Sequence, residues 1–324
     1  MPTVSIIVPN YNHAPFLAQR LDSIFNQTYQ DFEVVLLDDA SSDNSVEILN
    51  LYAEKYKEKI SHFIVNQNNS GSPFKQWKKG IELAKGEYIW IAESDDWAEP
   101  ELLQTLLNYL TKHKNVGLAY CQSFEVDVHS NRIRDFHFWT DDLDPTLWRK
   151  NFVLPGSTFL NYLVKKNVIP NASAVLFRKA LYKDVGKVQT NFRLVGDWDL
   201  WVRLLAKASI GYSPLCLNHF RASSSTTRYI VRKDKKELRI LEELKMLKGL
   251  AHLNCVEGEL INIQQQYLLN EWKKLYISDF QPVLIFKNFD FFKFNLFYNY
   301  RWKEVMKLSK AIFSYLKLKS YKAE

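Results

Sequence analysis

The chain has 324 residues, 47% of them hydrophobic, with ten glycines and ten prolines. This length suits one full domain with an extension, or two domains, and the composition excludes a collagen-like or low-complexity protein. The formal net charge of +7 is concentrated in residues 281–324, which hold nine Lys/Arg against three Asp/Glu. An excess of positive charge that is confined to one end of the chain argues against a nucleic-acid binder and for a local anionic partner.

Cysteine usage and hydropathy predict a cytoplasmic protein. Three widely spaced cysteines have no zinc-ligand spacing and are odd in number, which favours buried thiols in a reducing compartment. The apolar run after Met1 is too short for a signal peptide. No run reaches the roughly 20 apolar residues of a membrane-spanning helix.

The first part of the chain alternates short apolar runs with amphipathic stretches. This spacing of strands and helices predicts a Rossmann-like, doubly wound and mostly parallel sheet. Strands are expected at 4–8, 32–37, 60–66 and 87–92, with helices at 15–27, 45–56 and 73–84. Ligands bind at the carboxyl ends of such strands, so four loops should face one crevice. They are Pro9–Asn12, Asp38–Ser42, Asn68–Ser72 and Glu93–Asp96.

The strand at 87–92 leads directly into Glu93-Ser94-Asp95-Asp96, and Pro100 is expected to open the next helix. Three carboxylates at the end of a buried strand repel one another, so a positive charge is expected beside them. A divalent cation that carries phosphate oxygens fits, because hard cations take oxygen ligands. The alternative interpretation is a solvated turn.

The second part of the chain has a weaker pattern. A strand is expected at 116–122, and residues 125–155 show no clear period. Beyond them we expect a helix at 158–165, a strand at 171–178, a helix from Gly196 and a strand at 210–219. Residues 221–227 are polar, as in loops that close over a ligand. Long helical segments follow from about Lys233, and 302–318 is predicted to be an amphipathic helix with a basic face.

Several common site motifs are absent from the sequence. There is no GxGxxG after the first strand and no GxxxxGK[ST], which argues against dinucleotide and phosphate-loop NTPase sites. There is no HExxH or paired CxxC, and no GxSxG, which argues against zinc chemistry and an α/β-hydrolase. The features of the sequence that still indicate a functional site are the acidic residues at strand ends and the polar loops.

Five segments, in this order, resemble the family 2 glycosyltransferases of the GT-A fold. They are SIIVPNYN at 5–12, FEVVLLDDASSDNS at 32–45, NNSG at 68–71, AKGEYIWIAESDDWAEPELL at 84–103 and GDWDLWVRL at 196–204. The resemblance implies a GT-A domain at 1–225 with a nucleotide-binding half (about 1–122) and an acceptor half (about 123–225). A helical, basic and aromatic-rich extension would then occupy 226–324.

The resemblance also implies an activity and its partners. A hexosyl or hexosaminyl group would move, with inversion, from a nucleoside-diphosphate sugar to a hydroxyl of a glycan or lipid-linked acceptor. UDP is the first choice of nucleotide, and Mn²⁺ or Mg²⁺ is the expected cofactor. Bacterial surface-polysaccharide assembly is a setting that such an activity suits.

Site residues carried over from the resemblance begin with the donor. Pro9 and Tyr11, with Asn12 in the same loop, match the segment that frames the nucleotide base. Asp39 matches the acid that accepts a hydrogen bond from the base. Asp39 taken alone could also cap the following helix.

The acids of the central loop and one later acid match the reacting centre of the family. Asp95 would hold the metal against the phosphates, and Glu93 would face the ribose. Asp96 would support them or approach the sugar. Asp197 matches the general base, with an N-cap as its alternative role and Asp199 as its rival.

This sequence departs from the family pattern at three positions. Glu93 stands where the motif has Asp, and Gly196 stands where a Glu often precedes the base. Lys78-Lys79 replaces an Arg-Asn pair, which makes Lys78 a candidate for phosphate contact. Gly71 is a candidate as the position with positive φ in its loop. Arg221 is interpreted first as a structural residue, and it is also a candidate as a residue of a loop that closes over the diphosphate.

Two questions stay open at this point. The basic, aromatic segment 281–324 predicts a peripheral contact with the inner face of the membrane, and its alternatives are a packed helical subdomain or a homo-oligomer contact. The alternative functions are a nucleotidyltransferase and a non-catalytic scaffold on the same fold. A nucleotidyltransferase would need a basic, Gly-rich loop after the first strand.

Overall fold

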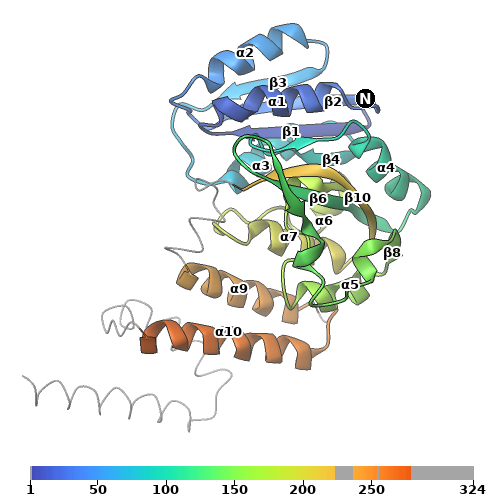
Figure 1. Ribbon diagram of the computed structural model, residues 1–324, viewed down its shortest axis with the longest axis vertical. Helices are drawn as coiled ribbons and strands as arrows, with labels where there is room; N and C mark the ends of the chain where they lie inside the picture. The colour runs from blue at the N-terminus through green and yellow to red at the C-terminus, as the bar shows by residue number, and fades with distance from the viewer. Residues whose placement is uncertain (1, 223–235, 254, 279–324) are drawn as a thin grey trace, which may run out of the picture. The chain divides into compact units, whose positions relative to one another are not determined.

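The computed structural model describes residues 2–222, 236–253 and 255–278. In these ranges ten strands form one sheet, in the order β3-β2-β1-β4-β9-β6-β10-β5, with β7 beside β6 and β8 beside β10 (Figure 1). The strands are β1 (Val4–Asn10), β2 (Phe32–Asp38), β3 (Ile60–Val65), β4 (Tyr88–Ile91), β5 (Trp97–Ala98), β6 (Val116–Val126), β7 (Arg132–Asp135), β8 (Phe152–Leu154), β9 (Val175–Arg178) and β10 (Ser209–Arg221).

Helices α1 and α4 cover one face of this sheet and α3 lies on the other. The helices of the described residues are α1 (Ala14–Phe25), α2 (Ser45–Lys55), α3 (Pro73–Leu83), α4 (Leu102–Lys112), α5 (Gly156–Leu163), α6 (Lys179–Asp184), α7 (Gly196–Leu205), α9 (Lys236–Ala251) and α10 (Gly258–Ser278). Short 3₁₀ turns are η1 (Phe136–Trp139), η2 (Leu147–Arg149) and η3 (Ala172–Ala174). The predicted α/β fold with helices after the sheet is confirmed.

Strand β1 lies at the centre of the parallel half, between β2 and β4. All seven of its residues are buried, because side chains point alternately to the two covered faces. Ile6 belongs to a core cluster with apolar side chains of α1 and α4. Ile7 lies against α3 on the opposite face, where Gly80 packs over it. Burial on both faces explains why this strand is a continuous apolar run in the sequence.

The second half of the sheet is mixed. Strand β9 runs antiparallel between β4 and β6, whereas β6 and β10 pair in parallel. The expectation that 125–155 is irregular is wrong in part, because β7 and β8 add short strands at the edges of β6 and β10. Strand β7 is mostly exposed, so it has no apolar alternation to detect.

Most predicted elements agree with the structure within a few residues, and the differences lie at their ends. Helix α4 begins at Leu102, two residues after Pro100. The strand predicted at 171–178 begins only at Val175, because η3 comes first. The last strand extends to Arg221, which therefore belongs to the sheet and not to a loop.

The chain divides into two compact units, 1–269 and 270–324. Helix α9 lies in the first unit, with the sheet, and the boundary expected at residue 225 stays a prediction. The segment 281–324, with its predicted amphipathic helix at 302–318, lies outside the described residues. Within the described part of the chain, no helix has the length and apolar character needed to cross a bilayer.

Candidate active site

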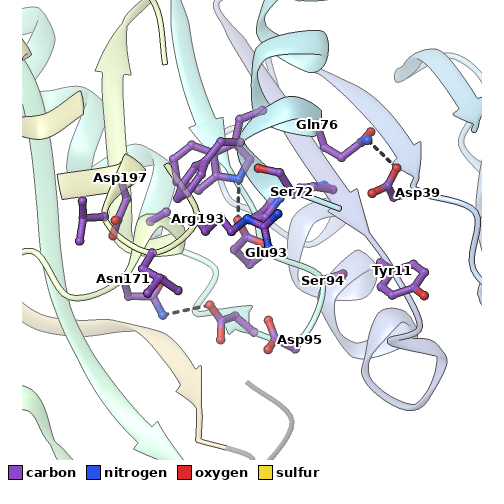
Figure 2. Close-up of a pocket in the computed structure, with 18 of the residues that line it drawn as sticks. Tyr11, Asp39, Ser72, Gln76, Glu93, Ser94, Asp95, Asn171, Arg193 and Asp197 are labelled. Atoms are coloured by element: carbon purple, nitrogen blue, oxygen red, sulfur yellow. Dashed lines mark hydrogen bonds between the residues drawn. The ribbon is translucent and has the colours of Figure 1, made fainter. Parts of the chain in front are cut away.

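A cleft of about 730 Å³ opens at the carboxyl ends of β1, β2 and β4 (Figure 2). All four loops that were predicted to face one crevice contribute to its walls. The other wall comes from η1, the segment before η3 and the loop that enters α7. Figure 2 shows Asp39 and Asp197 on opposite sides, with Glu93 between them. One cleft therefore joins acids that lie up to 158 positions apart in the chain (197 − 39 = 158).

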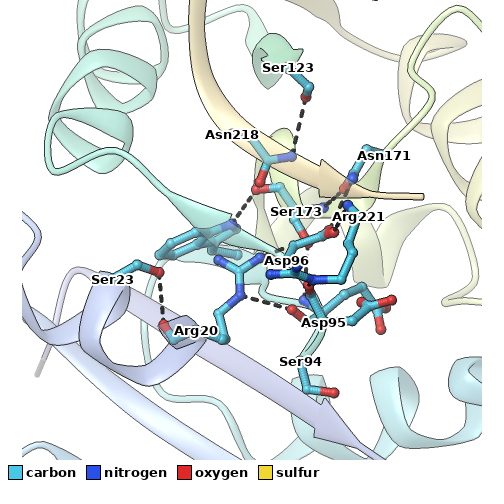
Figure 3. Close-up of polar contacts among 12 residues, drawn as sticks. Arg20, Ser23, Ser94, Asp95, Asp96, Ser123, Asn171, Ser173, Asn218 and Arg221 are labelled. Carbon is cyan, nitrogen blue, oxygen red and sulfur yellow. Dashed lines mark hydrogen bonds and ion pairs between the residues drawn. The ribbon is translucent and has the colours of Figure 1, made fainter. Parts of the chain in front are cut away.

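A buried arginine lies behind the acid loop, which is the name used here for residues 93–96. Arg20 of α1 donates from Nε to the main-chain oxygen of Glu93 at 2.8 Å, and its Nη2 lies 4.0 Å from Asp96 Oδ2 (Figure 3). Burial lowers the pKa of Arg20 to about 10, so the side chain still carries its charge at neutral pH. The protein itself thus supplies part of the positive charge that the clustered acids require. Sequence reasoning missed this residue.

Asp96 is held by the second half of the fold. Its Oδ2 accepts a hydrogen bond from Asn171 Nδ2 at 3.0 Å, and its Oδ1 accepts one from the main-chain N–H of Arg221 at 3.0 Å. Burial, followed by the neighbouring Asp95, raises the pKa of Asp96 to about 6. Because both oxygens make internal contacts, this geometry favours the supporting role over an approach to the sugar.

Arg221 was expected on a loop that closes over the ligand, and that expectation is wrong. It is the last residue of β10 and only 1% exposed. Its guanidinium donates to the main-chain oxygens of Asp95 and Asp127, each at 2.8 Å, and to Gln19 Oε1 at 2.9 Å. Arg221 is absent from the cleft lining and braces the acid loop from behind.

Glu93 projects into the cleft beneath a tryptophan. Trp77 of α3 donates from Nε1 to Glu93 Oε1 at 2.7 Å. Burial, followed by the charge of Asp95, raises the pKa of Glu93 to about 8. When no metal ion is bound, Glu93 therefore holds a proton at neutral pH.

The raised pKa of Glu93 makes the stability of the metal-free protein depend on pH. Its value lies above the ordinary 4.5, so between pH 4.5 and 8 the folded protein keeps a proton that the unfolded chain has lost. Stability therefore falls as the pH rises through this interval and levels off above it. Glu93→Gln removes this cost and keeps an oxygen for Trp77. We expect the variant to gain on the order of 1–3 kcal/mol at pH 8, at about 1.4 kcal/mol per pKa unit.

Thermal melts in EDTA from pH 5 to pH 8 measure this effect. The gap in melting temperature between Glu93→Gln and the wild type should widen as the pH rises. Glu58→Gln, which changes an exposed acid, serves as the control and should show a gap that does not depend on pH. A constant gap for Glu93→Gln, or a variant less stable than the wild type at pH 8, contradicts the raised pKa.

Asp39 organises the loop between β3 and α3. Its Oδ1 accepts hydrogen bonds from Asn66 Nδ2 at 2.6 Å and Gln76 Nε2 at 2.7 Å, and its Oδ2 accepts one from Ser70 Oγ at 2.7 Å. It does not cap the following helix, because the N-cap position of α2 is Asn44. Asp39 remains in the cleft lining, beside Gln76, which sequence reasoning missed.

The loop after β1 contributes two of its three candidates to the cleft. Pro9 and Tyr11 line it, and Tyr11 is 46% exposed, as expected of a ring that is open to a ligand. Asn12 does not line it. Its Oδ1 accepts a hydrogen bond from the main-chain N–H of Ser42 at 2.7 Å, which ties this loop to the one after β2. Gly71 lines the cleft and has φ +72°, which confirms the predicted backbone conformation.

Asp197 lies in the first turn of α7 and lines the cleft. Asn167 Nδ2 lies 3.3 Å from its Oδ2. Its rival Asp199 faces elsewhere, because Oδ2 accepts hydrogen bonds from Arg203 Nη2 at 2.7 Å and Nε at 2.9 Å. A Cβ at Gly196 would lie 2.7 Å from the ring of Phe74, which explains why a larger residue cannot precede the acid here.

One other candidate lies outside the cleft. Lys78 is on α3 but is not a lining residue. Sequence reasoning missed several lining residues, most of them in stretches without hydrophobic periodicity. They are Gln76, Trp77, Trp139, Asn167, Asn171, Arg193 and Arg239.

Comparison with known proteins defines the class. The model for "Glycosyl transferase family 2" matches residues 5–186. An uncharacterized glycosyltransferase of Rickettsia typhi is 26% identical over 266 residues, which cover 78% of this chain and 77% of that protein. The match to the family model spans more than half of the chain. The chain therefore belongs to glycosyl transferase family 2.

Solved structures agree on the fold. The S. aureus TarS fragment 1–349 with UDP-GlcNAc has a TM-score of 0.61 and 20% identity, covering 88% of this chain and 75% of that one. The mannosyltransferase PcManGT from Pyrobaculum calidifontis, with GDP-Man and Mn²⁺, has a TM-score of 0.57 and 16% identity, covering 92% and 81%. At this identity the likeness shows a shared GT-A fold.

Proposed function

We propose that the chain is an inverting glycosyltransferase. It moves a hexosyl or hexosaminyl group from a nucleoside-diphosphate sugar, with UDP as first choice, to a hydroxyl of a glycan or lipid-linked acceptor. The observation that carries the proposal is the single cleft walled by Asp39, Glu93 and Asp95 on one side and by Asp197 on the other. The proposal includes a role in bacterial surface-polysaccharide assembly, which is a setting that the family resemblance suggests.

The donor would occupy the nucleotide-binding half, about 1–122. Tyr11 offers an exposed ring to stack on the base, and Asp39 offers a carboxylate to accept from it. The acceptor would enter from the half at about 123–225, where Trp139 and Trp198 line the cleft. A structural neighbour bound to UDP-GlcNAc supports the choice of a nucleotide sugar as donor.

Asp95 is the proposed holder of Mn²⁺ or Mg²⁺. In the described ranges, no group of three or more His, Cys, Asp or Glu side chains is arranged so that it could hold a metal ion by itself. A single carboxylate in the cleft fits these cations, because they keep several waters and take their other ligands from phosphates. When bound, the cation would stabilise the charge that develops on the leaving diphosphate. PcManGT, solved with GDP-Man and Mn²⁺, supports this choice.

Asp197 is the proposed general base. Its carboxylate takes the proton of the acceptor hydroxyl, and that oxygen forms a bond to the anomeric carbon from the face opposite the diphosphate. The bond from the anomeric carbon to the phosphate oxygen breaks, and its electron pair leaves with the diphosphate. The N-terminus of α7 favours the negative charge on Asp197, and Asn167 helps to orient it.

The two alternatives are less well supported. A nucleotidyltransferase needs a basic, Gly-rich loop after the first strand to bind the triphosphate. The loop Pro9–Asn12 contains no glycine and no basic residue. A scaffold on the same fold requires neither Asp95 nor Asp197 to face the cleft, and both do. A peripheral membrane contact or self-association through 281–324 stays a prediction from the sequence.

Thermal stabilisation by nucleotides tests the donor site. The protein is melted with UDP, GDP, CDP and dTDP, each with Mn²⁺ and with EDTA. A ligand at a hundred times its Kd stabilises the folded state by about 2.7 kcal/mol. We expect one nucleotide, UDP first, to raise the melting temperature by several degrees with Mn²⁺ and not with EDTA. No shift with any of the four contradicts the proposed donor site.

A further inference from the structure

A glutamate of α9 reaches the loop that carries the proposed base. The Glu242 carboxylate accepts hydrogen bonds from three consecutive main-chain N–H groups, those of Arg193 at 2.8 Å, Leu194 at 2.9 Å and Val195 at 3.2 Å. Glu242 is only 7% exposed, and α9 packs against α7. These contacts join positions almost 50 residues apart in the sequence.

The Glu242 carboxylate lies at the start of helix α7. Val195 is the N-cap residue of α7, and its side chain makes no capping hydrogen bond. The main-chain N–H of Val195 is one of the groups at a helix start that have no partner within the helix, and Glu242 supplies that partner. Arg193 and Leu194 precede the helix. A carboxylate there is favoured twice, because charge-assisted hydrogen bonds are strong and the helix N-terminus attracts negative charge.

The residues that Glu242 holds are part of the cleft. Arg193, Leu194 and Val195 all line it, and Asp197 follows two positions later in the first turn of the helix. Arg239, one turn before Glu242 on α9, also lines the cleft. Helix α9 is therefore a wall of the candidate active site.

We propose that Glu242 is a positioning residue for the transfer reaction: it fixes the main chain at 193–195 and, through it, the direction of Asp197. This inference rests on the proposed function of Asp197. A displacement of a reacting group by about 1 Å can cost about 100-fold in rate, so a change at Glu242 should act on kcat. The donor contacts at Asp39 and Asp95 lie on other elements, and nucleotide binding should be unaffected.

Glu242→Gln is the main test variant. It keeps the size of the side chain but replaces one acceptor oxygen with an amide nitrogen that cannot accept. The assay measures release of the nucleoside diphosphate from the nucleotide sugar that most stabilises the wild type, with water as acceptor. We expect kcat to fall about 10- to 100-fold, with the KM for the nucleotide sugar little changed. Glu242→Asp keeps both oxygens and should recover part of kcat.

Glu33→Gln is the matched control. Glu33 is also a buried carboxylate. It accepts hydrogen bonds from the main-chain N–H of Lys85 at 2.5 Å and from the Ser5 hydroxyl at 2.6 Å, but it lies near the end of β2 that is opposite to the cleft. All proteins are assayed well below their melting temperatures. A positioning role predicts a loss of kcat for Glu242→Gln and none for Glu33→Gln.

Two outcomes overturn the inference: full kcat in Glu242→Gln, or equal losses of kcat in the two Gln variants. If Glu242→Gln does not fold, Glu242→Asp is compared with Glu33→Gln in the same way, with the same two outcomes. Failure of the proposed function is recognised separately, because the wild type would then neither bind a nucleotide nor release a nucleoside diphosphate.

Discussion

Asp197→Asn should lower kcat by about 10²- to 10⁴-fold, the usual contribution of a positioned general base. The amide has the shape of the carboxylate but cannot accept the proton of the attacking hydroxyl. The KM for the nucleotide sugar should change little, because the proposed donor contacts are at Asp39 and Asp95, across the cleft. Initial rates and a nucleotide melt on the same preparation separate the two effects.

Asp199→Asn is the control on the same helix. This change removes the negative charge that pairs with Arg203 (2.7 Å), so it should lower the melting temperature. Asp199 does not line the cleft, so kcat of the folded variant should stay near that of the wild type. The opposite pattern, a large loss of kcat at Asp199 and none at Asp197, would make Asp199 the base. Full turnover in Asp197→Asn would favour the scaffold alternative.

Asp95→Ala should abolish the Mn²⁺-dependent stabilisation by the nucleotide. It should also reduce turnover by about a thousandfold or more, because a Lewis-acid cation contributes several kcal/mol to the transition state. The structure gives the reason: the other two acids of the acid loop are bound by protein groups, so Asp95 is the acid available to hold a cation. Glu93 is bound by Trp77, and Asp96 is bound by Asn171 and the main chain of Arg221.

Nucleotide melts with and without EDTA check this result, together with a manganese titration. Glu58→Ala, which removes an exposed acid just before β3, is the matched control and should behave as the wild type. Manganese-dependent stabilisation that survives in Asp95→Ala would move the metal site to another residue. It would leave the assignment of the nucleotide pocket intact.

The donor side of the cleft was largely predictable from the sequence. Buried parallel strands are continuous apolar runs, and acids at their ends must face one edge of the sheet. Asp39, Glu93 and Asp95 followed from that pattern and the family resemblance, and all three line the cleft. Asp197 was found because the segment GDWDLWVRL at 196–204 resembles a segment of the family.

The prediction failed where a contact joins distant segments. Arg20 belongs to an amphipathic helix, and nothing in its neighbours shows that it will be buried beneath the acid loop. Arg221 was placed in a closing loop because the residues after it are polar, yet it is the end of a strand. Asn12 and Lys78 have plausible sequence positions, but their side chains do not line the cleft.

The sequence by itself determined the fold class, the order of the first strands and the family, because these depend on local patterns of period two and period 3.6 and on short motifs. Only the tertiary structure decided which carboxylate of the acid loop stays available to a ligand. It placed Arg20 against Asp96, Trp77 against Glu93 and Glu242 against the loop before Asp197. The physical reason is that burial and pairing set the charge and direction of a carboxylate, and both depend on partners that the chain brings together only when it folds.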